Sequence, residues 1–178
     1  MTATLLETPA LVDTLTNCPV GITGRSNDVP PPQWQGLRDI LIYLHNAGAR
    51  DLHHGMCQGG DHAAHQIAVT LNDGMPRSND RWQIHGHPGV NGRGEVWKRM
   101  PVDDPFEFAT VELDRPFMDR NHVIVYRTRT LVALPRFPEG HGGSRRSGTW
   151  ATVRMARRLG RQIIYVLPDG TITEKAPE

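Results

Sequence analysis

The stretch over residues 129–170 constrains the fold of this chain more than any other. It opens with the apolar run Thr130–Pro135 and closes with a second apolar run, Gln162–Leu167. Between them, a glycine-rich loop leads into a segment that places Val153 and Ala156 on one helical stripe. Two apolar runs joined by one helix predict a right-handed parallel crossover, in which the loop lies at the carboxyl end of the first strand.

The start of this helix is a candidate anion site. Ser147 or Thr149 can cap the helix, Gly148 lies between them, and Arg145 and Arg146 precede them in the loop. The first amide groups of a helix have no partner within it, so they favour an anion at that end. We therefore expect a phosphate or another anion to bind there. The alternative is an ordinary surface loop with solvated arginines.

Length and composition indicate one globular domain. The chain has 178 residues, enough for one sizeable core, and 38% of them are apolar. We expect the domain to span residues 17–170, with an arm before it over residues 1–16 and a polar tail after it over residues 171–178. A net charge of +1 argues against a protein that grips long nucleic acid by charge alone.

The sequence favours a cytoplasmic protein that is not bound to a membrane. No apolar run approaches the roughly 20 residues of a membrane span, and the amino end has no signal-peptide pattern. Cys18 and Cys57 do not make a disulfide framework. His62 and His65 lie near Cys57, but no Cys-x-x-Cys pair completes a zinc pattern. We therefore expect neither a metal nor another cofactor.

The whole chain is predicted to form an α/β fold, a Rossmann-like doubly wound parallel sheet with strand order 3-2-1-4-5. Residues 89–115 have weak periodicity and are expected to form an excursion over the site, either a lid or a dimer contact. The strands before the fourth are predicted at residues 18–24, 50–55 and 81–88, and the helices at residues 30–48, 62–71 and 117–126.

In this strand order, the sheet has its switch point between the first and fourth strands. The turn Gly24-Arg25-Ser26 and the loop before Ser147 would face each other in that crevice, where open α/β sheets bind ligands. A second glycine-rich turn, Gly59-Gly60-Asp61, follows the second strand, and Asp61 can cap the next helix. A G-x-G-x-x-G fingerprint is absent, so a standard NAD site is not expected.

Three further residues are candidates for contact with a base or a ribose. His85 and His87 lie at the exit of the third strand, and Trp150 follows the predicted phosphate cradle. The alternatives are a solvated strand end for the histidines and a core position for Trp150. The last helix carries four arginines that form either a solvated face or a nucleic-acid track: Arg154, Arg157, Arg158 and Arg161.

Three separated motifs resemble one family, the DNA-processing protein A family. Gly55–His65 resembles its G-x-x-x-G-x-D-x-x-A-H segment, Arg120-Asn121 resembles its arginine–asparagine pair, and Ser147–Thr152 resembles its S-G-S/T-x-x-T helix start. The wider group is the SLOG superfamily, which also contains the lonely-guy phosphoribohydrolases. The resemblance covers residues 17–170.

The resemblance implies a Rossmann-like protein, often dimeric, that binds nucleotides, nucleotide-derived signals or nucleic acid. Ser147, Gly148 and Thr149 would hold phosphate, Arg25, Arg120 and Arg146 would neutralise its charge, and Asp61 would bind ribose. The implied ligand-binding residues are Gly24, Arg25, Ser26, Gly59, Gly60, Asp61, Arg120, Arg146, Ser147, Gly148 and Thr149.

One departure from the superfamily concerns catalysis. The phosphoribohydrolases carry P-G-G-x-G-T-x-x-E with a catalytic glutamate, whereas Ala151 and Thr152 follow Thr149 here. The same hydrolysis by the same residue is therefore not expected. If the chain is an enzyme, Asp61 and Arg120 are the catalytic candidates.

We expect a protein that binds a nucleotide-like small molecule, as a sensor, a carrier or an N-glycosidic hydrolase. In the last case Asp119 could also supply an acid. The alternative is a single-stranded DNA-binding protein of the recombination-mediator type. By analogy, we expect a homodimer or a higher homo-oligomer.

Overall fold

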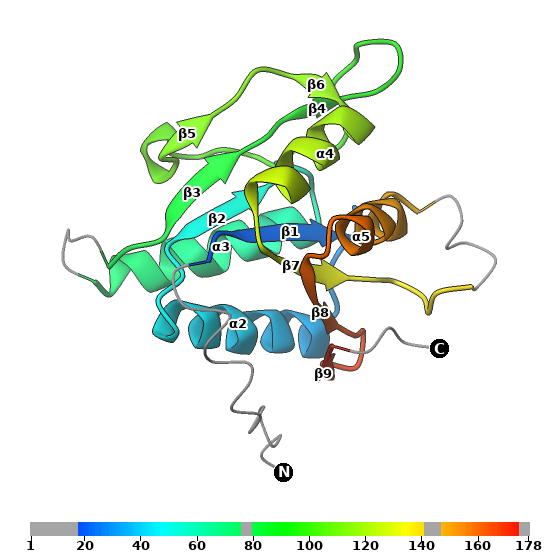
Figure 1. Cartoon of the computed structure of the whole chain (residues 1–178). Helices are drawn as coiled ribbons and strands as arrows, with labels where there is room; N and C mark the ends of the chain where they lie inside the picture. The colour runs from blue at the N-terminus through cyan, green and yellow to red at the C-terminus, as the bar shows by residue number, and fades with distance from the viewer. Residues whose placement is uncertain (1–17, 76–79, 141–146, 175–178) are drawn as a thin grey trace.

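The computed structural model describes residues 18–75, 80–140 and 147–174, in which strands and helices alternate (Figure 1). Every strand and helix predicted above is present. The first elements are β1 (Val20–Gly24), α2 (Pro31–Asn46), β2 (Asp51–His54), α3 (Gly60–Asp73) and β3 (Gln83–Gly86). The excursion then contains β4 (Gly89–Val90), η1 (Pro105–Glu107), β5 (Thr110–Val111) and β6 (Arg115–Pro116). The last elements are α4 (Phe117–Arg127), β7 (Thr130–Leu134), α5 (Gly148–Arg158), β8 (Gln162–Val166) and β9 (Ile172–Thr173).

β1 lies at the centre of the main sheet, between β2 and β7. Within the described residues the strand order is β5-β3-β2-β1-β7-β8-β9. Val20 pairs with Leu52 on one side and with Thr130 on the other, both in parallel register. The five predicted strands therefore have the predicted order 3-2-1-4-5, with the switch point between β1 and β7. This is a Rossmann-like doubly wound α/β fold.

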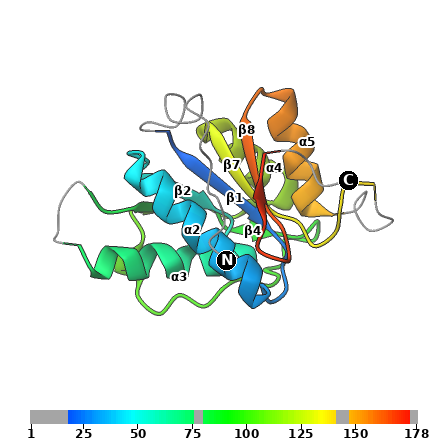
Figure 2. The ribbon, with the colours of Figure 1, turned by 90° about the horizontal axis from the view of Figure 1, so that it is seen from below.

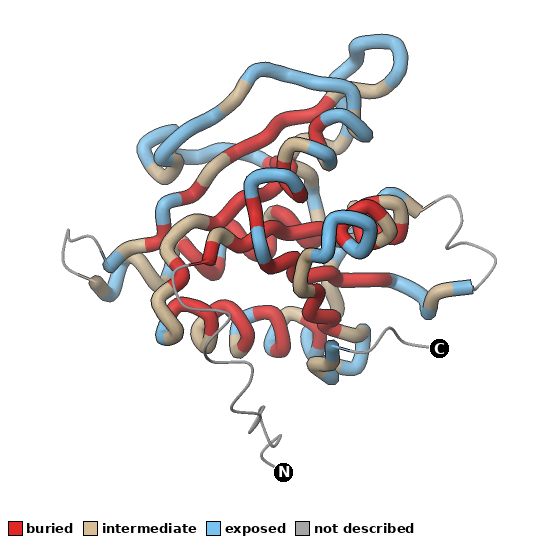
Figure 3. Tube along the Cα trace, in the orientation of Figure 1, coloured by how far each residue is buried: buried red, intermediate tan, exposed pale blue. Residues whose placement is uncertain are grey.

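Helices cover both faces of this sheet, α2 and α3 on one and α4 and α5 on the other (Figures 1 and 2). Strand side chains alternate between the two layers. In β7, Val132 and Leu134 pack with α2 and α3, whereas Leu131 and Ala133 pack with α5. Figure 3 shows the resulting buried core along the central strands and the inner sides of the helices. This double covering explains why β7 and β8 read as continuous apolar runs.

The helix starts agree with two of the three predicted starts. α2 begins at Pro31, whose fixed φ suits the first helical turn. α5 begins after Ser147, whose Oγ accepts a hydrogen bond from the Trp150 N–H at 3.4 Å. The N-cap of α3, however, is Gly59, and no side chain caps this helix. The predicted capping role of Asp61 is therefore wrong, because its carboxylate is held by other partners.

The excursion adds strands and returns to the cleft described below. β5 extends the main sheet beyond β3, and β4 pairs with β6 in a separate parallel pair. The Gln58 N–H donates to the Lys98 carbonyl at 2.7 Å, and the Met100 N–H donates to the Met56 carbonyl at 2.9 Å. These bonds fasten the excursion to the turn that follows β2.

The carboxyl-terminal tail supplies an edge strand, since β9 pairs antiparallel with β8. The predicted arm over residues 1–16 and the residues after 174 lie outside the described part of the chain. Among the helices that the structure describes, none is long and apolar enough to cross a membrane.

Candidate functional site

A cleft of about 450 Å³ lies at the carboxyl ends of β1 and β7, which is the switch point of the sheet. The turn after β1, the start of α4, the turn after β7 and the start of α5 line it. Its volume is in the range of small-molecule sites. The crevice between the first and fourth predicted strands therefore holds a cleft of suitable size.

Among the residues that the structure describes, most of the predicted ligand-binding residues line this cleft, and Gly59 and Gly60 do not. Gly59 and Gly60 lie behind the turn that follows β1, and Arg146 lies outside the described residues. The predicted residues that line the cleft are Gly24, Arg25, Ser26, Asp61, Arg120, Ser147, Gly148 and Thr149.

Gly59 and Gly60 support the first wall of the cleft instead of forming a second wall. The Gly60 N–H donates to the Arg25 carbonyl at 2.9 Å. Gly59 has a φ of 86°, and a Cβ there would lie 2.2 Å from the Arg25 carbonyl oxygen. A Cβ on Gly24 would lie 2.9 Å from the Gly60 Cα. The glycines thus let the end of β1 touch the start of α3, which fixes the backbone of Arg25 at the cleft.

Asp61 and Arg120 form a buried ion pair at the side of the cleft. Asp61 Oδ2 lies 3.6 Å from Arg120 Nη1, and the two side chains are 9% and 7% exposed. The same oxygen accepts a hydrogen bond from the Cys57 N–H at 3.2 Å. The guanidinium occupies space that only glycine leaves, since a Cβ on Gly55 would lie 1.0 Å from Arg120 Nη1. Asp61 therefore neutralises much of the positive charge of Arg120, the residue that was expected to bind phosphate.

Burial dominates the ionisation of this cluster. It raises the pKa of Asp61, against the opposing effects of Arg120 and of the backbone amides of Cys57 and Gly55. Burial also raises the pKa of the Cys57 thiol, and the charge of Asp61 acts in the same direction. Cys57 is therefore a protonated thiol at neutral pH and has no nucleophilic role.

Arg25 and Arg136 bring positive charge into the cleft. Among the residues that the structure describes, neither guanidinium forms an ion pair with a carboxylate. Arg25 Nε is buried without a hydrogen-bond partner. Burial lowers the pKa of Arg25, the charge of Arg136 lowers it further, and Asp28 opposes both. An anion in the cleft would relieve this repulsion.

The sequence reasoning missed Arg136, which supplies half of this charge. The residue directly follows Pro135 at the carboxyl end of β7, and this position was the available signal. Trp97 and Phe117 also line the cleft and were not predicted as site residues, because both lie in or beside the weakly patterned excursion.

The start of α5 is open to the cleft, whereas Trp150 is not. A Cβ on Gly148 would meet no atom within 4 Å, so the backbone there is accessible. Trp150 is buried, and its Nε1–H donates to the Phe137 carbonyl at 3.0 Å. Its ring packs with Val153 and Tyr165 in the core. Trp150 is thus a core residue, which corrects the suggestion that it stacks on a base.

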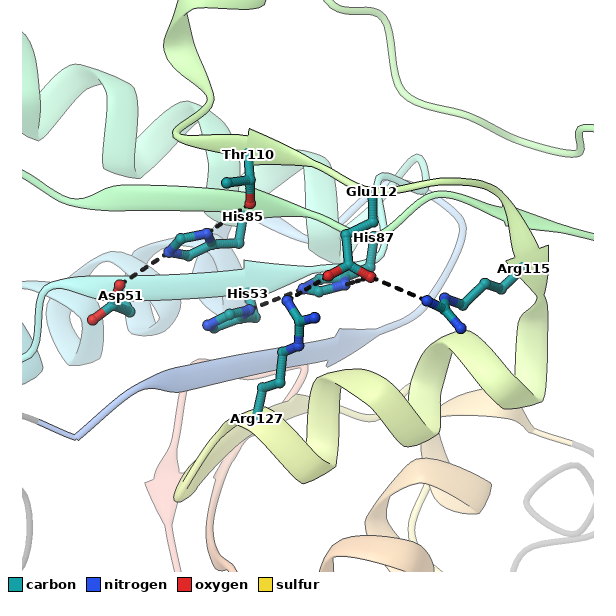
Figure 4. Close-up of polar contacts among 8 residues, drawn as sticks. All are labelled: Asp51, His53, His85, His87, Thr110, Glu112, Arg115 and Arg127. Atoms are coloured by element: carbon teal, nitrogen blue, oxygen red, sulfur yellow. Dashed lines mark hydrogen bonds and ion pairs between the residues drawn. The ribbon is translucent and has the colours of Figure 1, made fainter.

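His85 and His87 lie with His53 in a layer on the sheet, outside the residues that line the cleft (Figure 4). His87 Nε2 is 2.9 Å from His53 Nδ1, and His87 Nδ1 is 3.6 Å from Glu112 Oε2. The partners of His85 are Asp51 Oδ1 and Thr110 Oγ1, both at 2.9 Å. Both histidines therefore contact other protein groups outside the cleft, which corrects their assignment as base or ribose contacts.

The arginines of α5 do not form a continuous free track. Arg157 Nη1 lies 2.7 Å from Glu139 Oε2, and its Nη2 donates to the Tyr165 hydroxyl. Arg161 donates to the carbonyl groups of Val125 and Tyr126. Two of the four arginines expected in a nucleic-acid track thus hold the protein together. The single-stranded DNA alternative gains no support from this surface.

No protein-family model matches the chain, and no curated protein matches it. Among solved structures, the chain is similar to the X-ray structure of TM1055, a target of the Northeast Structural Genomics Consortium. The sequence identity is 15% and the TM-score is 0.49, over 81% of this chain and 71% of that chain. At this identity the likeness is one of fold alone, and function has to come from the residues of the cleft.

Proposed function

We propose that the cleft between β1 and β7 binds a nucleotide or a nucleotide derivative through its phosphate. One observation carries the proposal: Arg25 and Arg136 line the cleft beside the start of α5, without a carboxylate partner among the described residues. A phosphate would accept charge-assisted hydrogen bonds from both guanidinium groups. It would also meet the free amide groups of the first turn of α5.

Two features of the α5 start support the same position for the phosphate. The open backbone at Gly148 lets an oxygen approach the amide groups closely. Ser147 Oγ accepts from the Trp150 N–H, so the hydroxyl hydrogen of Ser147 stays available for a phosphate oxygen. In this proposal Arg136 joins Arg25 in neutralising the charge of the phosphate, a role for which the sequence suggested Arg25, Arg120 and Arg146.

We infer that the ligand is bound without cleavage of its N-glycosidic bond, as in a sensor or a carrier. Among the described residues that line the cleft, Asp61 is the carboxylate. Its Oδ2 is held by Arg120 and by the Cys57 N–H. A general acid, base or nucleophile needs to reach the reacting atom, and the ion-paired side chain of Asp61, only 9% exposed, is poorly placed to do so.

We further propose that the chain is a SLOG-superfamily protein of the DNA-processing protein A branch. The three motifs that carry the resemblance lie on different elements but meet around one cleft. Asp61 comes from the first motif, Arg120 and Asn121 from the second, and Ser147 from the third, and all four line the cleft. A shared ligand site is the simplest reason for this convergence.

The proposal is tested by isothermal titration calorimetry with ribonucleoside 5′-monophosphates and ribose 5-phosphate. We expect Arg25→Ala and Arg136→Ala each to weaken binding about 10- to 100-fold, because a hydrogen bond to a charged group contributes roughly 1.5–3 kcal/mol. Arg38→Ala is the matched control, since Arg38 is exposed on α2 and removes the same charge. Equal affinities in wild type and both cleft variants would contradict the proposal.

A further inference from the structure

Two aromatic rings stand together in the cleft. The ring centroids of Trp97 and Phe117 are 6.1 Å apart, with an interplanar angle of 62°, and both residues line the cleft. Trp97 is 51% exposed. Large aromatic rings bury much apolar area when they are covered, so an exposed ring in a cleft is a surface to which a flat ligand can bind.

Trp97 is held in this position by its neighbour Lys98. Lys98 Nζ donates to Asn27 Oδ1 at 2.8 Å, and the Lys98 carbonyl accepts from the Gln58 N–H at 2.7 Å. These contacts tie the excursion to the turns after β1 and β2. Lys98 itself has a φ of 50°, an uncommon conformation for a residue with a side chain, and it is kept there by these bonds. Lys98 Nζ also lies 4.9 Å from the centre of the Trp97 ring. These contacts hold the backbone that carries the indole ring, which forms one wall of the cleft.

Phe117 forms the support behind this wall. It is the first residue of α4, and a Cβ on Gly89 would lie 2.6 Å from its Cδ1. The Arg120 guanidinium carbon lies 5.7 Å from the centre of the Phe117 ring. Phe117 is thus packed between protein groups, whereas much of the Trp97 ring is open to solvent.

We propose that Trp97, supported by the edge of Phe117, stacks on the planar base of the ligand and so selects nucleotides over other phosphate esters. The inference rests on the proposed function and deepens it, because it adds a base-recognition surface to the phosphate site. Arginines supply the phosphate contacts and the aromatic pair supplies the base contact. Stacking is tolerant of base identity, so all four bases are expected to bind.

The test compares one ligand that has a base with one that lacks it. Adenosine 5′-monophosphate and ribose 5-phosphate are titrated into wild type, Trp97→Ala and Trp97→Phe by calorimetry. We expect Trp97→Ala to bind the nucleotide about tenfold more weakly and ribose 5-phosphate unchanged, with Trp97→Phe close to wild type. Tyr126→Ala is the matched control, because Tyr126 is 73% exposed and does not line the cleft.

Tryptophan fluorescence gives a second readout that does not depend on affinity. Nucleotide should quench the fluorescence of wild type, and this quenching should disappear in Trp97→Phe although binding persists. Unchanged nucleotide affinity in Trp97→Ala, or wild type that binds ribose 5-phosphate as tightly as the nucleotide, would overturn this inference and leave the phosphate site standing. Failure of both compounds to bind wild type would overturn the proposed function and this inference together.

Discussion

The arginines of this chain differ in whether they form an ion pair with a carboxylate of the protein. Arg120 is paired with Asp61, and Arg157 is paired with Glu139. Arg25 and Arg136 have no such partner among the described residues, and they meet in the cleft. At the residue scale, the proposed function rests on this difference, because only an uncompensated guanidinium gains much from an incoming phosphate.

The buried Asp61–Arg120 pair is expected to be important for stability. Asp61→Asn keeps the shape of the side chain but leaves a buried guanidinium without a counter-charge, which costs about 3–5 kcal/mol. Urea unfolding followed by circular dichroism measures this loss. Asp73→Asn is the control, since Asp73 is exposed at the other end of the same helix. Equal unfolding midpoints for the two variants would show that the pair does not carry this energy.

Gly59 is expected to tolerate no side chain. Gly59→Ala would place a Cβ 2.2 Å from the Arg25 carbonyl oxygen at a φ of 86°, so we expect a loss of about 2 kcal/mol or more. It should also weaken phosphate binding, because the backbone of Arg25 would shift. Gly92→Ala is the control, since a Cβ there meets no atom within 4 Å. Equal urea midpoints for the two variants would contradict the expected clash at Gly59.

The sequence predicted local features of the site better than long-range ones. Gly24, Arg25 and Ser147 were placed correctly because they follow or cap elements whose apolar pattern is strong. Asp61 was wrongly taken as a cap, since its carboxylate is bound by Arg120, a partner far along the chain. Pairings of this kind leave no local pattern in a sequence.

At the scale of elements, histidines fasten the excursion to the main sheet on both faces. On one face, His53 contacts His87, and His87 lies next to Glu112. On the other, His54 Nε2 is 3.3 Å from His65 Nδ1, and His65 Nε2 is 2.9 Å from Glu107 Oε2. Both glutamates flank β5. The Met56 N–H donates to His54 Nδ1, so the neutral His54 carries its proton on Nε2, toward His65.

These histidines are expected to make stability depend on pH. Burial lowers the pKa of His53 to about 3 and that of His87 to about 4, whereas their ordinary value is 6.5. Between these values the unfolded chain binds more protons than the folded chain. The stabilising contribution of the two neutral imidazoles is therefore fully present above pH 6.5. The free energy of unfolding falls as the pH is lowered toward 4, by at most about 1.4 kcal/mol per pH unit for each histidine.

Urea unfolding at a series of pH values checks this slope. His53→Gln should flatten it, since one of the buried imidazoles with a lowered pKa is removed. His122→Gln should leave it unchanged, because His122 is exposed on α4. Hydrogen exchange of residues 105–115 should rise first as the pH falls. A stability that stays constant from pH 7 to pH 4 would contradict the account of this layer.

The predictions of helices and strands were correct where the apolar pattern continued over several helical turns or over a full strand. β7 and β8 are buried on both sides, so their apolar runs were unambiguous. The excursion has no such continuous apolar pattern. β4, β5 and β6 have two residues each, too few for any alternation to be visible, and they are placed by pairing of β5 with β3 and of β4 with β6.

At the scale of the whole molecule, the strand order determines where the cleft lies. β1 has β2 on one side and β7 on the other, and the helices that follow β1 and β7, α2 and α5, lie on opposite faces of the sheet. The loops at the carboxyl ends of β1 and β7 therefore separate and leave a crevice. This could be predicted from the order of elements alone. The aromatic wall could not, because it depends on how Lys98 fastens the excursion.

The expected homo-oligomer is still a prediction at this scale. The excursion exposes Leu113 and Phe106 at 86% and 92%, and apolar side chains of this size are typical of contact surfaces. Sedimentation velocity should report a dimer for wild type, and Leu113→Glu should lower its apparent mass. Thr110→Glu, on the same surface, is the matched control. If the contact depends on Leu113, this variant should keep the apparent mass of wild type. A wild-type monomer at high concentration would refute the expectation.

The most direct test of the central claim is a nuclear magnetic resonance titration of the ¹⁵N-labelled chain with adenosine 5′-monophosphate. We expect the largest shifts at the amides of residues 24–26 and 147–149, because the phosphate would contact both segments. The Arg136→Ala protein should show these shifts only at much higher ligand concentration. Shifts confined to the layer of His85 and His87, or no shift at all, would contradict a phosphate site between β1 and β7.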